Sequence, residues 1–355
     1  MFRNCHRSLR VLGAALLLAA LGCAPAAQGP VFDPFTLFWP MPPEKPRVKY
    51  YDSLTGEADV KGARKMSLGD VIFGAPEVEF NLRKPYGVAT DSEGRVYVSD
   101  VGGIVVFDKK NGNMRMIGNT GAIRLVRPLG LFIDKKNSLL YVTDGALDRC
   151  YAFTLDGKVI REFGQKNELK DPGGVVVDTE RNLVFITNTK NHVVSVFDTE
   201  GKFIKNLGAR GKEPGEFNFP TQIAIDNLGR IYVVDSGNFR VQIIDQDGKP
   251  IKEFGSIGMR HGQFARPKGI AVSPEGILFI SDAMTHGMTV FDTDGTLLLT
   301  WGVRGWEKGM IDLPAGVHVD DKGLVYVVSQ WTAKVDIFQY LTYPEDKDLK
   351  TRDKK

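Results

Sequence analysis

The sequence contains few cysteines for its 355 residues. Cys5 and Cys23 lie close to the N-terminus, and only Cys150 lies in the body of the chain. A disulfide within one folded domain is therefore excluded, because the domain has no second cysteine to pair with. Cys150 follows Arg149 in a segment where apolar residues recur, so we expect a buried, unreactive thiol rather than a nucleophile.

Motifs of catalysis and cofactor binding are also absent. The patterns HExxH, GxSxG, GxxxxGK, CxxC and CxxCH do not occur, which excludes the commonest routes to an enzyme and to covalent haem. Histidine occurs after the N-terminal region only at His192, His261, His286 and His318. A catalytic zinc needs about three converging protein ligands, so we predict no catalytic residue, no metal and no cofactor.

Two segments begin like calcium-binding loops. They are Asp245-Gln-Asp247-Gly and Asp292-Thr-Asp294-Gly, and neither has glutamate at the twelfth position, which such a loop requires. Aspartate and glycine are also the residues that tight turns require. We therefore interpret both segments as hairpin turns.

A hydrophobic run long enough to cross a bilayer comfortably is missing as well. Residues 1–22 contain three arginines and then the apolar run VLGAALLLAAL, which ends at Gly22-Cys23. This pattern is typical of a cleaved signal peptide, and the run is too short for a membrane-spanning helix.

The end of this leader resembles the lipobox of bacterial lipoproteins. The matching residues are Ala20-Leu21-Gly22-Cys23, and the resemblance implies that Cys23 is lipidated and anchors the chain to a membrane. Ala24, in place of aspartate, implies an outer-membrane lipoprotein by the same resemblance. The alternative is an ordinary secretory signal with an incidental cysteine.

Residues 23–46 form a proline-rich tether, with seven prolines between residues 24 and 46. Such a segment favours extended polyproline conformation, about 3.1 Å per residue, and would hold a domain away from the bilayer. Its segment FTLFWP, residues 35–40, either belongs to this tether or packs on the domain.

Net charge gives no argument for an anionic partner. Loss of the three leader arginines leaves 43 Lys and Arg against 43 Asp and Glu. Overall charge therefore favours neither nucleic acid nor an anionic membrane surface. Nucleic acid is not an expected partner.

What the sequence does contain is a repeat. Units opening with Pro85, Pro128, Pro172, Pro220, Pro267 and Pro314 are spaced by 43, 44, 48, 47 and 47 residues. Within each unit, short runs of β-branched and aromatic residues alternate with turn segments such as DNLG and SPEG. This period predicts propeller blades, each with four antiparallel strands.

The repeat resembles the NHL repeat over about residues 84–340. The carrying residues are Asp235-Ser-Gly-Asn238-Phe-Arg240 in the fourth unit and Asn191-His192 in the third. The tryptophan–aspartate signature of WD40 blades is absent. The resemblance implies an all-β, six-bladed β-propeller.

The last unit contains only three predicted strands and ends at KVDIFQYL, residues 334–341. The segment VKYYD, which precedes the first unit, has the form of the missing fourth strand. We therefore predict that it pairs with the last blade and closes the ring, which removes exposed sheet edges. The predicted domain spans residues 47–341, with an insertion at about 57–80 and a disordered charged tail at 342–355.

Antiparallel strand order divides the turns between two faces of such a ring. The turns joining strands 1–2 and 3–4 are acidic, whereas those joining strands 2–3 and successive blades are basic and carry aromatic residues. Aromatic rings and arginine are typical of binding hot spots, so we expect a binding face there, formed by Tyr86, Arg127, His192, Arg240, Lys268, Trp306 and Trp331. The alternative for Arg240 is that it braces neighbouring blades.

These features favour a lipid-anchored propeller that binds an envelope protein or a polysaccharide and acts as a monomer without catalysis. A metal-dependent lyase or hydrolase is the first alternative. Related lyase propellers place zinc-binding histidines just after the opening proline, where this chain has none. RNA binding is the second alternative, because propellers of the resembled family bind RNA through a basic face.

Overall fold

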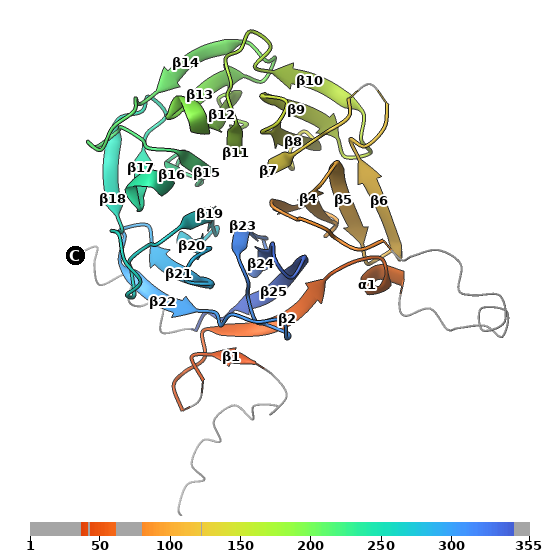
Figure 1. Ribbon diagram of the computed structural model, residues 1–355, viewed down its shortest axis with the longest axis vertical. Helices are drawn as coiled ribbons and strands as arrows, with labels where there is room; N and C mark the ends of the chain where they lie inside the picture. The colour runs from red at the N-terminus through yellow and green to blue at the C-terminus, as the bar shows by residue number, and fades with distance from the viewer. Residues whose placement is uncertain (1–36, 42, 62–79, 122, 344–355) are drawn as a thin grey trace, which may run out of the picture. The chain divides into compact units, whose positions relative to one another are not determined.

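The computed structural model describes residues 37–41, 43–61, 80–121 and 123–343. These residues form six antiparallel sheets arranged around a central axis, as Figure 1 shows. The fold is a six-bladed β-propeller, which confirms the architecture predicted from the repeat. Within the described part of the chain, no helix is long and apolar enough to cross a membrane.

Each blade runs from an inner strand at the axis to an outer strand at the rim. The first three blades are β3 (Val88–Thr90), β4 (Val96–Asp100), β5 (Gly103–Asp108), β6 (Asn113–Ile117); β7 (Pro128–Asp134), β8 (Leu139–Asp144), β9 (Arg149–Thr154), β10 (Val159–Phe163); β11 (Pro172–Asp178), β12 (Leu183–Asn188), β13 (Val193–Asp198), β14 (Phe203–Leu207). The next two are β15 (Pro220–Ile225), β16 (Ile231–Asp235), β17 (Arg240–Ile244), β18 (Pro250–Phe254); β19 (Pro267–Val272), β20 (Ile277–Asp282), β21 (Gly287–Asp292), β22 (Leu297–Trp301). The short helices are α1 (Ala58–Lys61), η1 (Thr189–Asn191) and η2 (Ser236–Asn238).

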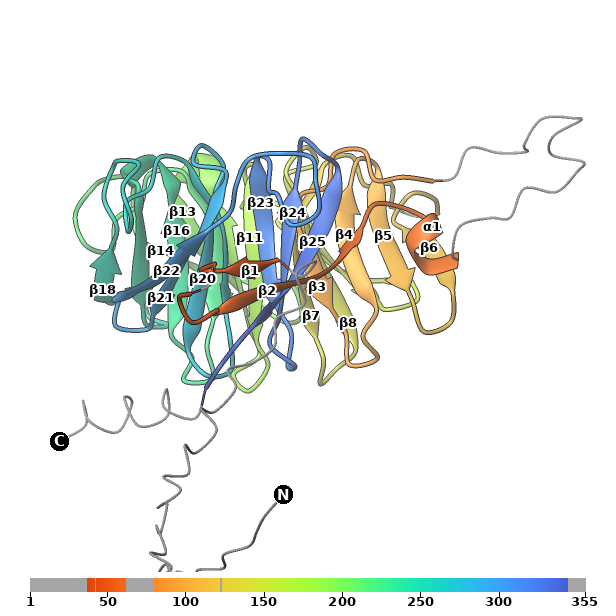
Figure 2. The same ribbon diagram turned by 90° about the horizontal axis from the view of Figure 1, so that it is seen from below.

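The sixth blade joins the two ends of the described chain. It contains β23 (Pro314–Val319), β24 (Leu324–Ser329), β25 (Lys334–Tyr340) and then β2 (Val48–Leu54). Strand β2 pairs antiparallel with β25, with Val48 opposite Tyr340 and Leu54 opposite Val335. The predicted ring closure by VKYYD is therefore present, and Figure 2 shows β2 on the outer side of β25.

A fifth strand, β1 (Phe38–Trp39), pairs with β2. The Trp39 ring contacts the Phe338 ring edge to face, with centroids 5.7 Å apart. The described part of FTLFWP therefore packs on the domain, which was one of the two interpretations of this segment. The leader, Cys23, most of the predicted insertion and most of the tail lie outside the described residues.

The hydrophobic core consists of six layers, one between each pair of neighbouring blades. Alternate residues of the strands face the blade on either side, so both faces of each sheet are apolar. Cys150 is buried between the second and third blades. Burial raises the pKa of its thiol strongly, which agrees with the predicted unreactive side chain.

A buried polar residue ends the second strand in every blade. Asp100 accepts hydrogen bonds from the backbone N–H groups of Arg83 and Lys84, at 2.8 and 2.7 Å. The same role falls in the other blades to Asp144, Asn188, Asp235, Asp282 and Ser329. Each of these side chains satisfies backbone donors of the loop that enters its blade, which explains the recurring polar residue in VYVSD, LYVTD and YVVD.

The acidic residues on one side of the ring also accept hydrogen bonds from the backbone. Asp245 accepts hydrogen bonds from the N–H groups of Asp247 and Lys249, and Asp292 caps its turn in the same way. Both calcium-like segments are therefore turns, as predicted. The same pattern recurs at Asp91, Asp198, Asp226 and Asp320.

Inner strands of neighbouring blades approach one another very closely. A side chain on Gly87 would place its Cβ 2.2 Å from the Leu129 carbonyl oxygen, and one on Gly269 would lie 2.1 Å from the Ala315 oxygen. Glycine is therefore required two residues after the opening proline wherever the next blade's carbonyl fills that space.

Candidate binding face

The loops that join strands 2–3 of each blade, and each blade to the next, lie together on one side of the ring; we call this side the loop face. The turns that join strands 1–2 and 3–4 lie on the opposite side, the turn face. This division follows from the antiparallel order of every blade. All seven predicted binding residues lie on or next to the loop face.

Lys268 lies at the centre of a cluster beside the channel mouth. Its ammonium is 5.5 Å from the ring centroid of Tyr86, and its Nζ lies 3.4 Å from Oε1 of Gln330. The Tyr86 backbone is fixed in turn, because its carbonyl accepts a hydrogen bond from the N–H of Gly316 at 2.7 Å. The structure thus brings blade 5, blade 6 and the start of blade 1 together around one amine.

The pKa values of this cluster reflect burial without a neutralising partner. Burial, and to a smaller extent the nearby Arg266 charge, lowers the pKa of Lys268 to about 8. Burial raises the pKa of Tyr86 to about 12. No carboxylate forms an ion pair with Lys268 among the described residues. An anionic or hydrogen-bond-accepting group on a ligand would supply the partner that this amine lacks.

Arg127 lies close enough to Tyr86 for its charge to act on the phenol. Its Nη2 lies 2.7 Å from Oδ1 of Asp171, and the ammonium of Lys190 lies 3.4 Å from Oδ2 of the same carboxylate. Arg127 is half exposed, so this pair fixes the guanidinium while leaving it open to solvent.

Trp306 and Trp331 are the most exposed aromatic side chains described, at 68% and 62%. Trp331 follows Gln330 directly, and the ammonium of Lys334 donates to the Glu307 carbonyl oxygen, 2.9 Å away. These links place the loop of Trp331 beside the loop of Trp306. Lys268, Trp306, Trp331, Tyr86 and Arg127 therefore follow one another along the loop face, from blade 5 through blades 6 and 1 to the start of blade 2.

Exposed apolar and basic side chains are concentrated on the loop face. Among the large apolar residues exposed in the described chain, the turn face has Leu228, whereas the loop face has Val101, Val126, Phe219, Ile257, Met259, Met284, Val303, Trp306 and Trp331. The exposed bases of the loop face are Arg83, Lys84, Arg124, Arg127, Lys166, Lys170, Lys190, Arg210, Lys212, Arg260, Arg266, Arg304 and Lys308. The exposed acids described in its loops are Glu213 and Glu307.

Two of the predicted binding residues have a different role. Arg240 is 8% exposed, and its guanidinium bonds Asp235 at 2.9 Å, Glu253 at 2.6 Å and the carbonyl oxygens of Glu213 and Glu216. Four of its five N–H donors are therefore engaged within the fold, and the buried guanidinium braces its blade against the preceding loop. This is the alternative stated from the sequence, and Arg240 is removed from the candidate binding set.

His192 is also a bracing residue. It is 7% exposed, its Nδ1 accepts the N–H of Phe219 at 3.1 Å, and its ring lies 4.3 Å from the Phe219 ring. Burial lowers the pKa of His192, which keeps Nδ1 available as an acceptor. The prediction that it contacts a partner is replaced by a structural role between the third and fourth blades.

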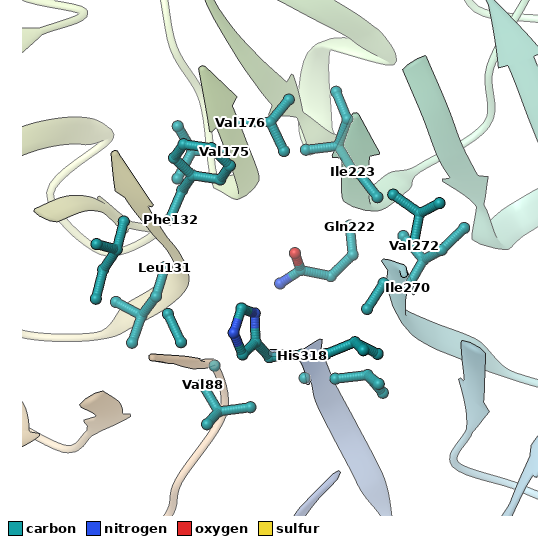
Figure 3. Close-up of a pocket in the computed structure, with 18 of the residues that line it drawn as sticks. Val88, Leu131, Phe132, Val175, Val176, Gln222, Ile223, Ile270, Val272 and His318 are labelled. Carbon is teal, nitrogen blue, oxygen red and sulfur yellow. The ribbon is translucent and has the colours of Figure 1, made fainter. Parts of the chain in front are cut away.

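The channel inside the ring contains a cavity of about 150 Å³, lined by the inner strands (Figure 3). His318 lines it, and its Nε2 lies 2.8 Å from the Thr90 hydroxyl. Burial lowers the pKa of His318 to about 4, so the imidazole is neutral near pH 7. Within the described residues, no group of three or more His, Cys, Asp or Glu side chains could hold a metal ion.

Sequence reasoning did not identify Gln222, which also lines the cavity, or Gln330 beside Lys268. The signal for Gln222 was present in the repeat. It replaces the glycine found two residues after the opening proline in every other unit.

Fold and sites together define a six-bladed β-propeller with a basic, aromatic loop face and an apolar channel. Residues 164–237 match the model of a family described as a 6-bladed beta-propeller. No curated protein matches the chain.

Solved structures share the fold. A protein of unknown function from Bacteroides thetaiotaomicron has a TM-score of 0.62 and 15% identity, over 82% of this chain and 75% of its own. A streptogramin B lyase has a TM-score of 0.51 and 15% identity, over 73% and 94%. A chain of a nidogen–laminin complex has a TM-score of 0.51 and 19% identity, over 63% and 83%. At these identities the likeness extends to the fold alone.

Proposed function

We propose that this protein is a lipid-anchored, NHL-type propeller of the cell envelope that binds an envelope protein or a polysaccharide through its loop face. The anchor would be lipid on Cys23, in an outer-membrane lipoprotein. The chain would act as a monomeric, non-catalytic platform.

The observation that carries the proposal is the concentration of exposed aromatic and basic side chains on the loop face. Exposed tryptophans cost solvation free energy that packing against a partner would recover. Lys268, which has no ion-pair partner among the described residues, the fixed Arg127 and the Tyr86 ring offer hydrogen bonds, charge and a stacking surface on the same face. Protein interfaces and sugar-binding surfaces both use this combination.

The test is capture from the protein's own cell by proximity labelling with the full-length chain. We expect Tyr86→Ala/Trp306→Ala/Trp331→Ala to lose the labelled partners. The matched control is Tyr51→Ala/Ile204→Ala/Leu228→Ala, which removes exposed apolar side chains elsewhere and should retain them. Because Tyr86 is half buried, the double variant Trp306→Ala/Trp331→Ala repeats the test with side chains whose loss should not affect folding. Unchanged labelling in both loop-face variants would refute the proposal.

The anchor has its own test. Cys23→Ser should release the protein from the membrane fraction and abolish incorporation of labelled fatty acid. If the variant stays membrane-bound without incorporating the label, the anchor is an uncleaved leader rather than lipid on Cys23.

Two findings would favour the alternatives. Stoichiometric zinc or calcium retained through dialysis by the purified, lipid-free protein would point to a metal-dependent lyase or hydrolase. Cytoplasmic retention of a reporter fused after the leader would return RNA binding to consideration.

A further inference from the structure

The channel cavity differs from the loop face in chemistry. Its walls carry Val, Ile, Leu and Ala residues from the six inner strands, together with a few polar side chains. Four residues after the opening proline, where all six positions line the cavity, three blades carry alanine: Ala89, Ala224 and Ala271. These short side chains leave the space of about 150 Å³ unfilled.

Some of the polar side chains that line this space have hydrogen-bond or ion-pair partners, and one has none among the described residues. The Thr90 hydroxyl and the His318 ring bond each other, and the ammonium of Lys135 at the edge pairs with Asp321 at 2.5 Å. Gln222 has no hydrogen-bond partner within the described part of the chain, although it is only 9% exposed. Figure 3 shows its carboxamide pointing into the cavity toward His318.

Gln222 occupies a place where the repeat has glycine. The corresponding residues are Gly87, Gly130, Gly174, Gly269 and Gly316. In blade 4 the neighbouring Thr221 donates its hydroxyl to the Lys268 carbonyl, 3.1 Å away. The other five units carry glycine at the position of Gln222, so blade 4 is the one that directs a side-chain amide into the channel from this position.

The Gln222 amide has no side-chain or backbone partner among the described residues, so its hydrogen bonds are available to a molecule in the cavity. The lining combines aliphatic side chains with the polar residues Thr90, Lys135, Gln222 and His318. A cavity of this size accommodates a molecule of about benzene size.

We propose that the channel is a binding site for a neutral, compact organic molecule with an apolar body and one amide group that pairs with Gln222. A charged ligand is disfavoured, because the site offers it no unpaired counter-charge and desolvation of an ion is costly. The neutral imidazole of His318 lies across the cavity from the carboxamide of Gln222 (Figure 3). This site is independent of the loop face and of any partner bound there.

Benzamide and toluene are suitable probes, because both have an apolar ring and only benzamide has the amide. Binding to the purified, folded chain would be measured by titration calorimetry and by ligand-observed NMR. We expect both probes to bind, and Gln222→Leu to weaken benzamide about tenfold, as expected for lost hydrogen bonds, while toluene changes less than about twofold. Ala271→Leu, which fills the cavity, should abolish both, and the exposed turn-face variant Leu228→Ala should change neither.

The proposal is overturned if neither probe binds the folded wild-type chain, which would mean that the cavity holds only water. It is also overturned if Gln222→Leu leaves benzamide affinity unchanged. If Ala271→Leu unfolds the protein, the wild-type chain provides the test. A change in the NMR chemical shifts of the Gln222 side-chain amide on addition of benzamide would place the probe in the channel. Resonances that do not move would place the probe elsewhere and refute the channel site.

Discussion

At the scale of single residues, burial decides which charged side chains can bind a partner. Arg240 begins the third strand of its blade and Arg127 precedes the opening proline of its blade. Both were predicted to bind, yet the first is enclosed by four partners and the second remains half exposed. Sequence alone could not separate them. The residues that enclose Arg240 lie 5 to 27 positions away, on neighbouring strands and a loop.

Arg240→Ala is predicted to destabilise the fold by about 3–5 kcal/mol, because it leaves the buried carboxylate of Asp235 without its counter-charge. Urea denaturation measures this loss. Arg260→Ala, on an exposed loop of the same face, should change stability by less than about 0.5 kcal/mol. Equal effects of the two substitutions would mean that the buried network contributes little.

His318 should make stability depend on pH. Its folded pKa of about 4 lies below the unfolded value of 6.5, so the unfolded chain binds the proton more readily between these values. The neutral His318 therefore contributes its full stabilisation of the fold above pH 6.5. This contribution, at most about 3 kcal/mol, is lost as pH falls toward 4. Asp336 has the opposite dependence, since burial raises its pKa to about 6 and its ionisation costs stability as pH rises.

The difference between wild type and His318→Gln isolates the histidine, because Asp336 is common to both proteins. We expect the wild-type denaturation free energy to fall relative to His318→Gln between pH 7 and about pH 4. Parallel curves over that range would show that the imidazole is solvated and titrates normally.

At the scale of elements, β2 is the strand that completes the ring. Leu54→Ala, at a fully buried position of β2, should cost about 2–5 kcal/mol. Tyr51→Ala, on the exposed side of the same strand, should cost less than about 1 kcal/mol. Denaturation of both variants measures the contribution of ring closure. Similar small losses would mean that the other blades remain folded without β2.

The sequence was sufficient to predict the six blades and this closing strand, because both depend on local pattern. The opening prolines define the period, and the last unit has one strand too few. Strand β1 was left open, since two residues in a proline-rich segment give no alternation to interpret. The direction of Gln222 also escaped prediction, because the corresponding residue of every other unit is glycine and gives no side chain to compare it with.

At the scale of the whole molecule, the two faces have different charge for different reasons. Many acids of the turn face cap their own turns and are thereby engaged with the backbone. The exposed bases of the loop face have few acids beside them. The charge available to a partner is therefore more one-sided than a count of residues suggests.

Charge reversal tests whether this asymmetry matters for binding. Arg260→Glu/Arg266→Glu changes two exposed loop-face bases, and Lys202→Glu/Lys249→Glu changes two exposed turn-face bases by the same net charge. We expect the first variant to bind the captured partner about tenfold more weakly at about 50 mM salt, with the difference shrinking at about 300 mM because the Debye length shortens. The second variant should stay within about twofold of wild type. Equal weakening of both variants would mean that the partner responds to net charge rather than to the loop face.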